Sequence, residues 1–460
     1  MSDKKTSVFG LDRASRSKLK TLIPAERPVH TAAHDEAAGE IPRQDLYDES
    51  LTSFSELPAY KQLKIFNAVS EKMGIFNPFY LCHQSIAKQR TIINGEEYLN
   101  YSTYDYLGLN GHPAVNAAAM DAIKVFGTSA GASRLLAGER PGHKILEDNL
   151  ADFYQTEAAL IFVSGHATNV STLATLLGPA DVVYHDALVH DSVLQGALLS
   201  GAQRYSYPHN DCAALETLLE KSRDRHRRAL IATEGLFSMD GSIADLPRLI
   251  ELKRRFGAFL MVDEAHALGV TGETGRGTRE YFNLAPDDVD IWMGTMSKTL
   301  CGCGGFIAGS AVLTELLRFK APGFVYSVGM SPALAAASNA ALNLLREDPD
   351  RVRRLQRLSA LFLKEAKARG LNTGYAVGYG IIPVIVGSSV VACMLCERLL
   401  ARKINVMPIM YPAVEEGTAR LRFFLSAAHE EEPITEVLDI LVEELAKARD
   451  AAETAREGGV

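Results

Sequence analysis

The middle of the chain alternates between short apolar runs and amphipathic stretches of helical length. Runs this short, separated by helical stretches, predict the strands of a mostly parallel sheet that is covered by helices on both faces. Ligands of such sheets bind at the carboxyl ends of the strands, in the loops that follow them. The predicted strands are 158–163, 182–184, 204–207, 229–233, 259–262, 291–295 and 305–308.

The sequence on either side of this region has a different pattern. Apolar residues recur at helical spacing over 58–76, and Asn94-Gly95 predicts a hairpin over 92–99. The C-terminal part mixes helices and strands, which is typical of a smaller α+β domain. Its predicted elements are a long helix over 332–369, a strand over 380–387, a helix over 391–402, a strand over 421–425 and a closing helix over 434–451.

These patterns divide the chain into four parts. Residues 1–57 are polar, rich in charge and without periodicity, so we expect an extension that is partly disordered or docks a partner. Residues 58–114 form an N-terminal segment of helix and hairpin. We expect the large ligand-binding domain over 115–330 and the small C-terminal domain over 331–460.

Composition narrows the class of protein. Of the 460 residues 47% are apolar, so the chain can bury a large core, and its net charge of −8 argues against a nucleic-acid partner. The basic cluster 223–228 is typical of the solvated end of a helix. The sequence has neither an apolar run long enough to span a bilayer nor a signal-peptide core. We therefore expect a cytoplasmic protein without a transmembrane segment.

The six cysteines are too few for a disulfide scaffold in a chain of this length. Cys393 and Cys396 have the spacing of a redox or metal half-site, but no second pair completes a zinc site. They share one face of a predicted helix, and we interpret them as core residues. We therefore expect no metal.

A lysine and an aspartate carry the strongest chemical signal. Lys298 lies in the run 294–300, which contains serine, threonine and glycine, and Asp263 follows the apolar strand over 259–262. A lysine can hold the aldehyde of pyridoxal phosphate as a Schiff base, and an aspartate can keep the pyridine nitrogen protonated. The alternatives are a surface lysine and a helix-capping aspartate. The order and spacing of the two residues favour a pyridoxal phosphate site.

A phosphate group needs backbone N–H donors, which the start of a helix supplies. The run 163–169 follows a predicted strand and opens a predicted helix. Its Gly165 permits a ligand to approach the backbone closely. This run is the candidate phosphate loop.

Ordered motifs along the chain resemble those of the α-oxoamine synthases. These fold-type I pyridoxal phosphate enzymes include aminooxononanoate synthase, serine palmitoyltransferase, aminolevulinate synthase and 2-amino-3-ketobutyrate ligase. The resemblance runs from about residue 60 to the end. It implies an α/β transferase fold like that of aspartate aminotransferase, with a pyridoxal phosphate-binding large domain. The matching segments are 104–109, 131–134, 234–241, 263–266, 272–277 and Arg422 with 427–429.

The resemblance assigns roles to individual residues. Lys298 is the expected Schiff-base lysine and acid–base group, and Asp263 is the expected partner of the pyridine nitrogen. His266 is expected to bond the phenolic oxygen of the cofactor, and His190 to stack on its ring, although a helix cap or a core histidine is the alternative for His190. The further cofactor contacts that it implies are Gly165, His166, Ser238 and Thr295, with Ser327 reaching the phosphate across a homodimer interface. His166 stands where the family usually has an aromatic residue, so only its backbone contact carries over.

Three residues are expected to bind substrate. Arg422 is the expected clamp for the amino-acid carboxylate, because a guanidinium matches a carboxylate in two contacts. Arg420 competes for this role, since it shares the strand face. Tyr104 replaces the asparagine of many family members, and Ser133 replaces the threonine of aminolevulinate synthases.

The resemblance implies one reaction class. An amino acid (serine, alanine or glycine) condenses with an acyl thioester, carried by coenzyme A or an acyl carrier protein, and carbon dioxide is lost. Tyr104 leads us to prefer a reaction like that of serine palmitoyltransferase, in sphingolipid or secondary-metabolite synthesis, over 8-amino-7-oxononanoate synthase. An aminotransferase would share Lys298 and Asp263. A non-catalytic partner subunit would typically lack the lysine.

Overall fold

The computed structural model describes residues 49–457 except 73 and 75, so most of the predicted extension lies outside the described residues. Its described end forms two short 3-10 helices, Glu49–Thr52 and Phe54–Glu56. Helix α2 (Pro58–Lys72) follows, within the range that its periodicity predicts.

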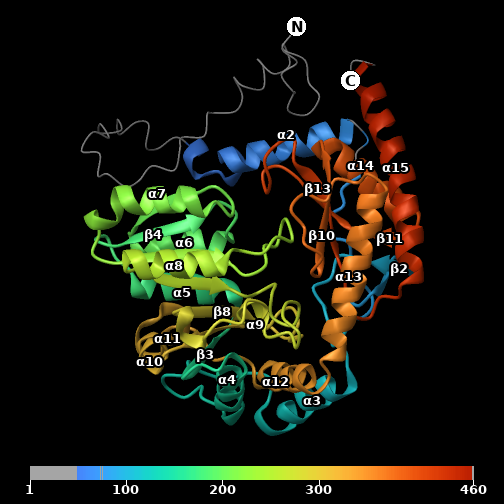
Figure 1. Cartoon of the computed structure of the whole chain (residues 1–460). Coiled ribbons are helices and arrows are strands. Elements are labelled where there is room, and N and C mark those ends of the chain that lie inside the picture. Colours follow the sequence, from blue (N-terminus) through green and yellow to red (C-terminus); the bar gives the residue numbers. More distant parts are fainter. Residues whose placement is uncertain (1–48, 73, 75, 458–460) are drawn as a thin grey trace.

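A seven-stranded sheet forms the centre of the described structure (Figure 1). Its strand order is β3-β9-β8-β7-β6-β4-β5, and only β9 runs antiparallel to its neighbours. The predicted mostly parallel sheet is therefore confirmed. The strands are β3 (Ala158–Phe162), β4 (Val182–Asp186), β5 (Gln203–Tyr207), β6 (Ala229–Glu234), β7 (Phe259–Asp263), β8 (Ile291–Thr295) and β9 (Gly305–Gly309).

Helices cover both faces of this sheet, because successive side chains of a strand point to opposite sides and both sets are apolar. One face packs against α5 (Gly165–Leu176), α6 (Asp191–Ser200), α10 (Ala311–Lys320) and α11 (Pro322–Val325). The other face packs against α4 (Pro141–Tyr154), α7 (Cys212–Ser222), α8 (Leu246–Phe256) and α12 (Pro332–Glu347), and α3 (Pro113–Phe126) packs on α12.

The long helix predicted over 332–369 is wrong in one respect, because the structure has two helices there. Helix α12 ends at Glu347 and α13 (Asp350–Ala368) begins after Pro349. A proline has no N–H to donate and disfavours helical geometry in the residue before it, so it ends the first helix. Helix α13 leaves in a new direction and runs along the small domain, beside β10 (Ile381–Gly387) (Figure 1).

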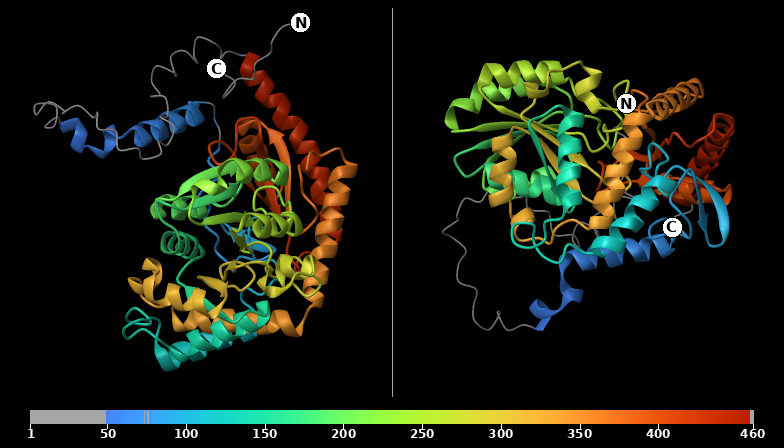
Figure 2. Two further views of the ribbon diagram at one scale, coloured as in Figure 1. Left: turned by 60° about the vertical axis from the view of Figure 1, so that its left-hand side comes forward. Right: turned by 90° about the horizontal axis from the view of Figure 1, so that it is seen from below.

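The small domain combines residues from both ends of the described chain. Strands β10 (Ile381–Gly387), β13 (Ala419–Phe424) and β12 (Met407–Ile409) form an antiparallel sheet. The predicted hairpin, β1 (Arg90–Ile93) and β2 (Glu96–Asn100), pairs in parallel with β11 (Ile404–Asn405). Helices α14 (Ser389–Ala401) and α15 (Glu432–Glu457) complete the domain, which Figure 2 shows beside the central sheet.

Several polar features of the sequence serve the fold. The guanidinium group of Arg223 donates to Phe256 O and Gly257 O at the end of α8, and Arg227 pairs with Asp181. Cys393 and Cys396 are buried in α14. Within residues 49–457, gaps aside, no helix is long and apolar enough to cross a bilayer, and no His, Cys, Asp and Glu side chains cluster as metal ligands would.

Candidate active site

Asp263 is fixed at the carboxyl end of β7 by two elements. It is buried, and its Oδ2 accepts a hydrogen bond from Nδ2 of Asn169 at 2.9 Å, while Oδ1 accepts from the backbone N–H of Ala265 at 2.9 Å. Asn169 lies on α5 and also donates to Ser192 on α6. Asn169 was not assigned a role from the sequence, because its contact with Asp263 joins residues 94 positions apart.

Lys298 lies in the loop after β8, beside the ring of Tyr104. The distance from Nζ to the ring centroid is 5.7 Å, and the amine makes no hydrogen bond to a described residue. Burial lowers the pKa of Lys298 to about 8, although the charges of Asp263 and Glu234 act in the opposite direction. About a tenth of this amine is therefore unprotonated at pH 7, far more than for an ordinary lysine, and only the unprotonated form is a nucleophile for an aldehyde.

His266 is held by a tyrosine that the sequence analysis did not assign. Its Nδ1 lies 2.7 Å from the hydroxyl of Tyr106, and both residues are buried. Burial, with the charge of Lys298 next, lowers the pKa of His266 well below its usual value. The imidazole is therefore neutral, and the tyrosine leaves its Nε2 free.

The predicted phosphate loop has the geometry of an anion site. Ser164 caps α5, since its Oγ accepts from the backbone N–H of Ala167 at 3.1 Å. A methyl group on Gly165 would lie 3.1 Å from Oγ1 of Thr295, so only glycine leaves this space open. Thr295 Oγ1 also donates to Gly304 O at 2.8 Å. Backbone donors, a hydroxyl and an open cradle suit the phosphate of pyridoxal phosphate.

His190 is the N-cap of α6, which was the alternative considered for it. Its Nδ1 lies 2.6 Å from Oγ of Ser192 and accepts from the N–H of the same residue at 3.3 Å. Burial lowers the pKa of His190, while the neighbouring charge of Asp263 raises it. The histidine thus borders the cluster of Asp263 and Lys298, and stacking on a ring remains a prediction.

The two candidate arginines on β13 have different surroundings. Arg420 is buried in an ion pair with Asp240. Arg422 donates to Ser238 O at 2.9 Å and lies 3.4 Å from the hydroxyl of Tyr104, while its buried Nε has no partner in the described part of the chain. Arg422 is therefore available to a carboxylate, and Arg420 is not.

Two carboxyl groups at the strand ends were not assigned from the sequence. Glu264 is buried under Gly277 and accepts from the backbone N–H of Thr278 at 2.9 Å, so it holds the 272–277 loop in place. Glu234 is buried at the end of β6, next to Asp263 in register.

Asp186, His209 and Ser242 are arranged like a hydrolase triad, outside the lysine cluster. Nδ1 of His209 lies 3.0 Å from Asp186 Oδ1, and Nε2 lies 2.8 Å from Ser242 Oγ. Ser242 is only 3% exposed, so it does not present a nucleophile to a substrate. The three residues connect two loops, one that leads to His190 and one that carries Ser238. We interpret their hydrogen bonds as structural.

A cavity of about 550 Å³ opens beside Lys298. Most of the side chains around it are polar, and it extends from the lysine toward the hairpin of the small domain. Its lining comprises His83, Ala87, Asn100, Ser102, Thr103, Tyr104, Asp105, Asn110, Ser297, Lys298, Cys301 and Gly302.

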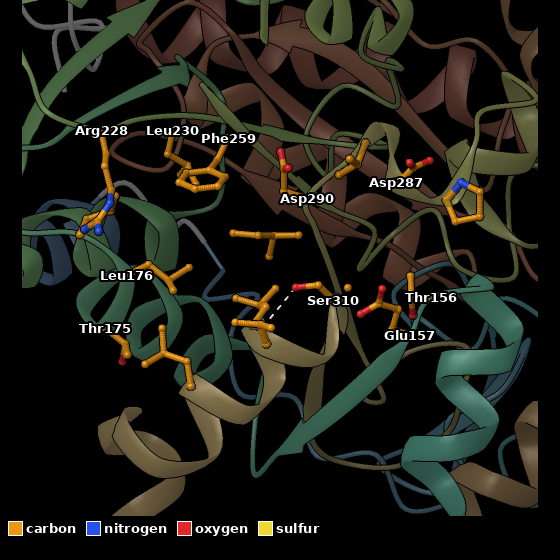
Figure 3. Close-up of a pocket in the computed structure, with 18 of the residues that line it drawn as sticks. Thr156, Glu157, Thr175, Leu176, Arg228, Leu230, Phe259, Asp287, Asp290 and Ser310 are labelled. Carbon is orange, nitrogen blue, oxygen red and sulfur yellow. Dashed lines mark hydrogen bonds between the residues drawn. The ribbon is translucent and has the colours of Figure 1, made fainter. Parts of the chain in front are cut away.

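A second cavity, of about 520 Å³, lies at the opposite edge of the sheet, where the parallel strands begin (Figure 3). Several of its polar groups serve the fold. Glu157 accepts from the N–H of Ala311 at 2.8 Å, and Asp290 pairs with Lys253. Its remaining lining is largely apolar, so we assign no chemistry to it.

Ser133 and Ser327 are not joined to the Lys298 cluster. No hydrogen bond, ion pair or ring contact within the described residues connects either of them with Lys298, Asp263 or Arg422. They lie on neighbouring loops, because Gly329 N–H donates to Ala132 O at 2.9 Å. Large apolar side chains are exposed on these loops, namely Leu135, Leu136, Tyr326 and Val328.

Comparisons with known proteins identify the class of enzyme. The model of the aminotransferase class I and II family matches residues 96–441, and the chain belongs to this family. The 8-amino-7-oxononanoate synthase of Geobacter sulfurreducens is 44% identical over 344 residues, or 74% of this chain and 87% of that one. The 8-amino-7-oxononanoate synthase 1 of Bacillus subtilis is 38% identical over 358 residues, or 78% of this chain and 91% of that one.

A solved structure adds the cofactor. A lysine-to-alanine variant of serine palmitoyltransferase from S. paucimobilis carries a PLP–myriocin aldimine. It has a TM-score of 0.82 and 26% identity, over 85% of this chain and 98% of that one. Within the family, this protein is an α-oxoamine synthase, a pyridoxal 5′-phosphate-dependent acyltransferase with the fold-type I architecture. Its class condenses an amino acid with an acyl thioester.

Proposed function

We propose that this enzyme condenses L-alanine with the thioester of a seven-carbon dicarboxylic acid, and so makes 8-amino-7-oxononanoate. Relatives named 8-amino-7-oxononanoate synthase are about 40% identical to this chain. They support this reaction more strongly than the serine palmitoyltransferase reaction that Tyr104 led us to prefer, for which the likeness is structural, at about 27% identity.

The structure of the product defines the substrates. Its carbons 8 and 9, with the amino group, are what remains of alanine after its carboxyl group leaves as carbon dioxide. Carbons 1 to 7 end in a carboxylate, so they come from a dicarboxylic acyl group whose other end is the thioester. The new bond joins the α-carbon of alanine to the thioester carbonyl carbon, and the free thiol departs.

The observation that carries the proposal is the polar lining of the cavity beside Lys298. Its hydroxyl, amide and imidazole groups bond to neighbouring protein groups, and a polar wall of this kind suits a short acyl chain with a charged end better than a long alkyl chain. A volume of about 550 Å³ is within the usual range for a small-molecule site.

In this proposal each residue of the site has a defined role. Bound pyridoxal phosphate supplies an electron sink for the carbanion at the α-carbon. Lys298 holds the cofactor and moves the α-proton, because its low pKa leaves the amine free to accept one. Asp263 would accept a hydrogen bond from the protonated ring nitrogen. Gly165, the N–H of His166 and Thr295 would hold the phosphate. Ser238, His190 and His266 would hold the ring.

Arg422 and Tyr104 position the amino acid. The hydroxyl of Tyr104 lies 3.4 Å from Nη2 of Arg422. A carboxylate bound beside both groups therefore receives hydrogen bonds from a charged donor and from a neutral one. The clamp fixes the angle between the bonds at the α-carbon and the ring, which selects the bond that breaks.

We propose that the enzyme acts as a homodimer. Ser327 and Ser133 lie apart from their own chain's lysine, on loops with exposed apolar side chains that a second copy would cover. The Ser327 hydroxyl would then serve the phosphate of the partner subunit, and the loop that carries Ser133 would border the partner's substrate pocket.

A matrix of substrates tests the reaction. Purified enzyme with pyridoxal phosphate is given alanine, serine or glycine together with pimeloyl-, heptanoyl- or palmitoyl-coenzyme A, and free thiol and product mass are measured. We expect turnover with alanine and the pimeloyl thioester, and at least tenfold lower kcat/KM with the heptanoyl thioester, which lacks only the carboxylate. Preference for serine with the palmitoyl thioester would contradict the proposal and favour a serine palmitoyltransferase reaction.

A further inference from the structure

Polar residues replace apolar ones at the ends of three adjacent strands, all on one face of the sheet. Every second residue of β6, β7 and β8 packs in the core beneath α5 and α6: Leu230, Ala232, Met261, Ile291 and Met293. The next positions in this alternation are Glu234, Asp263 and Thr295. Two of these three are proposed cofactor contacts, and the third, Glu234, has no role in the mechanism described above.

Glu234 and Asp263 are direct neighbours across the β6–β7 ladder, so their side chains project to the same side. Both residues are buried, at 3% and 5% exposure. Each oxygen of Asp263 receives a donor, whereas Glu234 receives the N–H of Ser238 at 3.2 Å on Oε2 only. Its Oε1 is buried without a hydrogen-bond partner among the described residues.

Two ionised carboxylates side by side in a buried site repel each other, and the one with fewer donors keeps a proton. Burial, followed by the charge of Asp263, raises the pKa of Glu234 to about 8. The charged and titratable groups that face it from neighbouring elements are Asp263 on β7, Lys298 after β8 and His190 before α6. The charge of Lys298 and the backbone N–H of Ser238 oppose the rise.

We propose that Glu234 is a positioning residue that holds one proton beside Asp263 and, when it loses that proton to solvent, keeps the nitrogen of Lys298 protonated. The second negative charge then stabilises the cationic form of the lysine linkage to the cofactor. Glu234 thereby widens the pH range over which the proposed enzyme keeps that linkage protonated and open to attack by an amine. This inference rests on the proposed role of Lys298.

The test is a pH titration of the visible absorbance of the pyridoxal phosphate-loaded protein, without substrates. Glu234→Gln keeps the shape of the carboxyl group and removes its charge. We expect the midpoint of the lysine linkage to fall by about 0.5–1 pH unit, as loss of one nearby charge predicts. Glu234→Asp, which keeps a titratable carboxyl group, should lie between this variant and the unaltered protein. Cofactor affinity, measured in parallel, should change less than about threefold in both.

Glu264→Gln is the matched control, because it removes another buried carboxyl group at the same end of the sheet. Both oxygens of Glu264 are engaged by Thr278, so this variant should lose thermal stability and keep the midpoint. An unchanged midpoint in Glu234→Gln, or equal shifts in both glutamine variants, would overturn the proposal. If Glu234→Gln does not bind pyridoxal phosphate, an unchanged midpoint in Glu234→Asp would overturn the proposal instead. Absence of any visible band from the unaltered protein would instead refute the proposed role of Lys298.

Discussion

At the scale of single residues, the site depends on which polar atoms the fold leaves without partners. Arg420 and Arg422 have the same side chain on the same strand face. Asp240 neutralises the first, whereas no carboxylate among residues 49–457, gaps aside, pairs with the second. The sequence predicted both as candidates. Only the position of Asp240, on a loop 180 residues earlier in the chain, separates them.

Replacing Arg422 should weaken substrate binding, whereas replacing Arg420 should lower the stability of the fold. Arg422→Ala should raise the KM for the amino acid roughly 10–100-fold, the loss of one charge-assisted contact, and leave the KM for the thioester nearly unchanged. Arg420→Ala should instead destabilise the fold by about 3–5 kcal/mol, because Asp240 remains buried and unpaired. Steady-state kinetics and thermal unfolding measure the two effects. Equal rises in both KM values for Arg422→Ala would place the carboxylate clamp elsewhere.

Substitution of Lys298 tests the chemistry without disturbing the fold, because its amine makes no hydrogen bond to another described residue. Lys298→Ala should abolish turnover, because the amine proposed to hold the cofactor is lost, while circular dichroism and the unfolding temperature stay close to those of the unaltered protein. Detection of carbon dioxide release and free thiol measures turnover. Rates like those of the unaltered enzyme would end the proposed role of this lysine.

At the scale of elements, strands and loops were predictable because their signals are local. The apolar runs located the seven strands, and motif spacing located the loops that follow β3, β7 and β8. Asn94 and Gly95 have φ values of 52° and 78°, which explains why this pair marked the hairpin. The break at Pro349 was missed because apolar periodicity continues across it, even though proline is a local signal for a helix end.

Contacts between distant elements were not predictable in this way. Tyr106 and His266 are separated by 160 residues, and Asn169 and Asp263 by 94. A hydrogen bond between such residues depends on how strands and helices are arranged in space, and no spacing in one sequence encodes it. The resemblance supplied the residues expected to touch the cofactor, but it did not supply those that hold them in place.

The first turn of α5 permits a test of the phosphate loop. Gly165→Ala should weaken pyridoxal phosphate binding roughly tenfold, about 1.4 kcal/mol, because the added methyl group lies 3.1 Å from Oγ1 of Thr295. Thermal stability should change little, since the helix propensity of alanine offsets the close contact with Thr295. Gly142→Ala, in the first turn of α4 with open space around it, is the control and should leave affinity unchanged. Equal affinity in both variants would move the phosphate elsewhere.

At the scale of the whole molecule, the described chain carries the lysine cluster and two serines that do not reach it. This separation is the reason to expect paired subunits. The separation also explains why Ser327 was assigned to the site only through the family resemblance. Its hydroxyl would act in the site of another copy of the chain.

Subunit mixing distinguishes shared sites from separate ones. Lys298→Ala and Ser327→Arg should each be inactive alone, and their co-refolded mixture should recover about a quarter of the sites, since half of the dimers are mixed and each carries one intact site. The control combines both substitutions in one chain and mixes it with the unaltered protein, where mixed dimers gain no intact site. Failure of the first mixture to recover activity would show that Ser327 does not serve a partner.

The pairing of β2 with β11 has a consequence for synthesis of the protein. The N-terminal hairpin exists early in translation, but its parallel partner is made only when residues 404–405 have been added, and Arg422 later still. Domains generally fold as they emerge, at about 5–20 residues per second, so the hairpin waits with an open strand edge. A chain that terminates early keeps that edge permanently and exposes it to other chains. Aggregation, not partial activity, is the expected fate of such fragments.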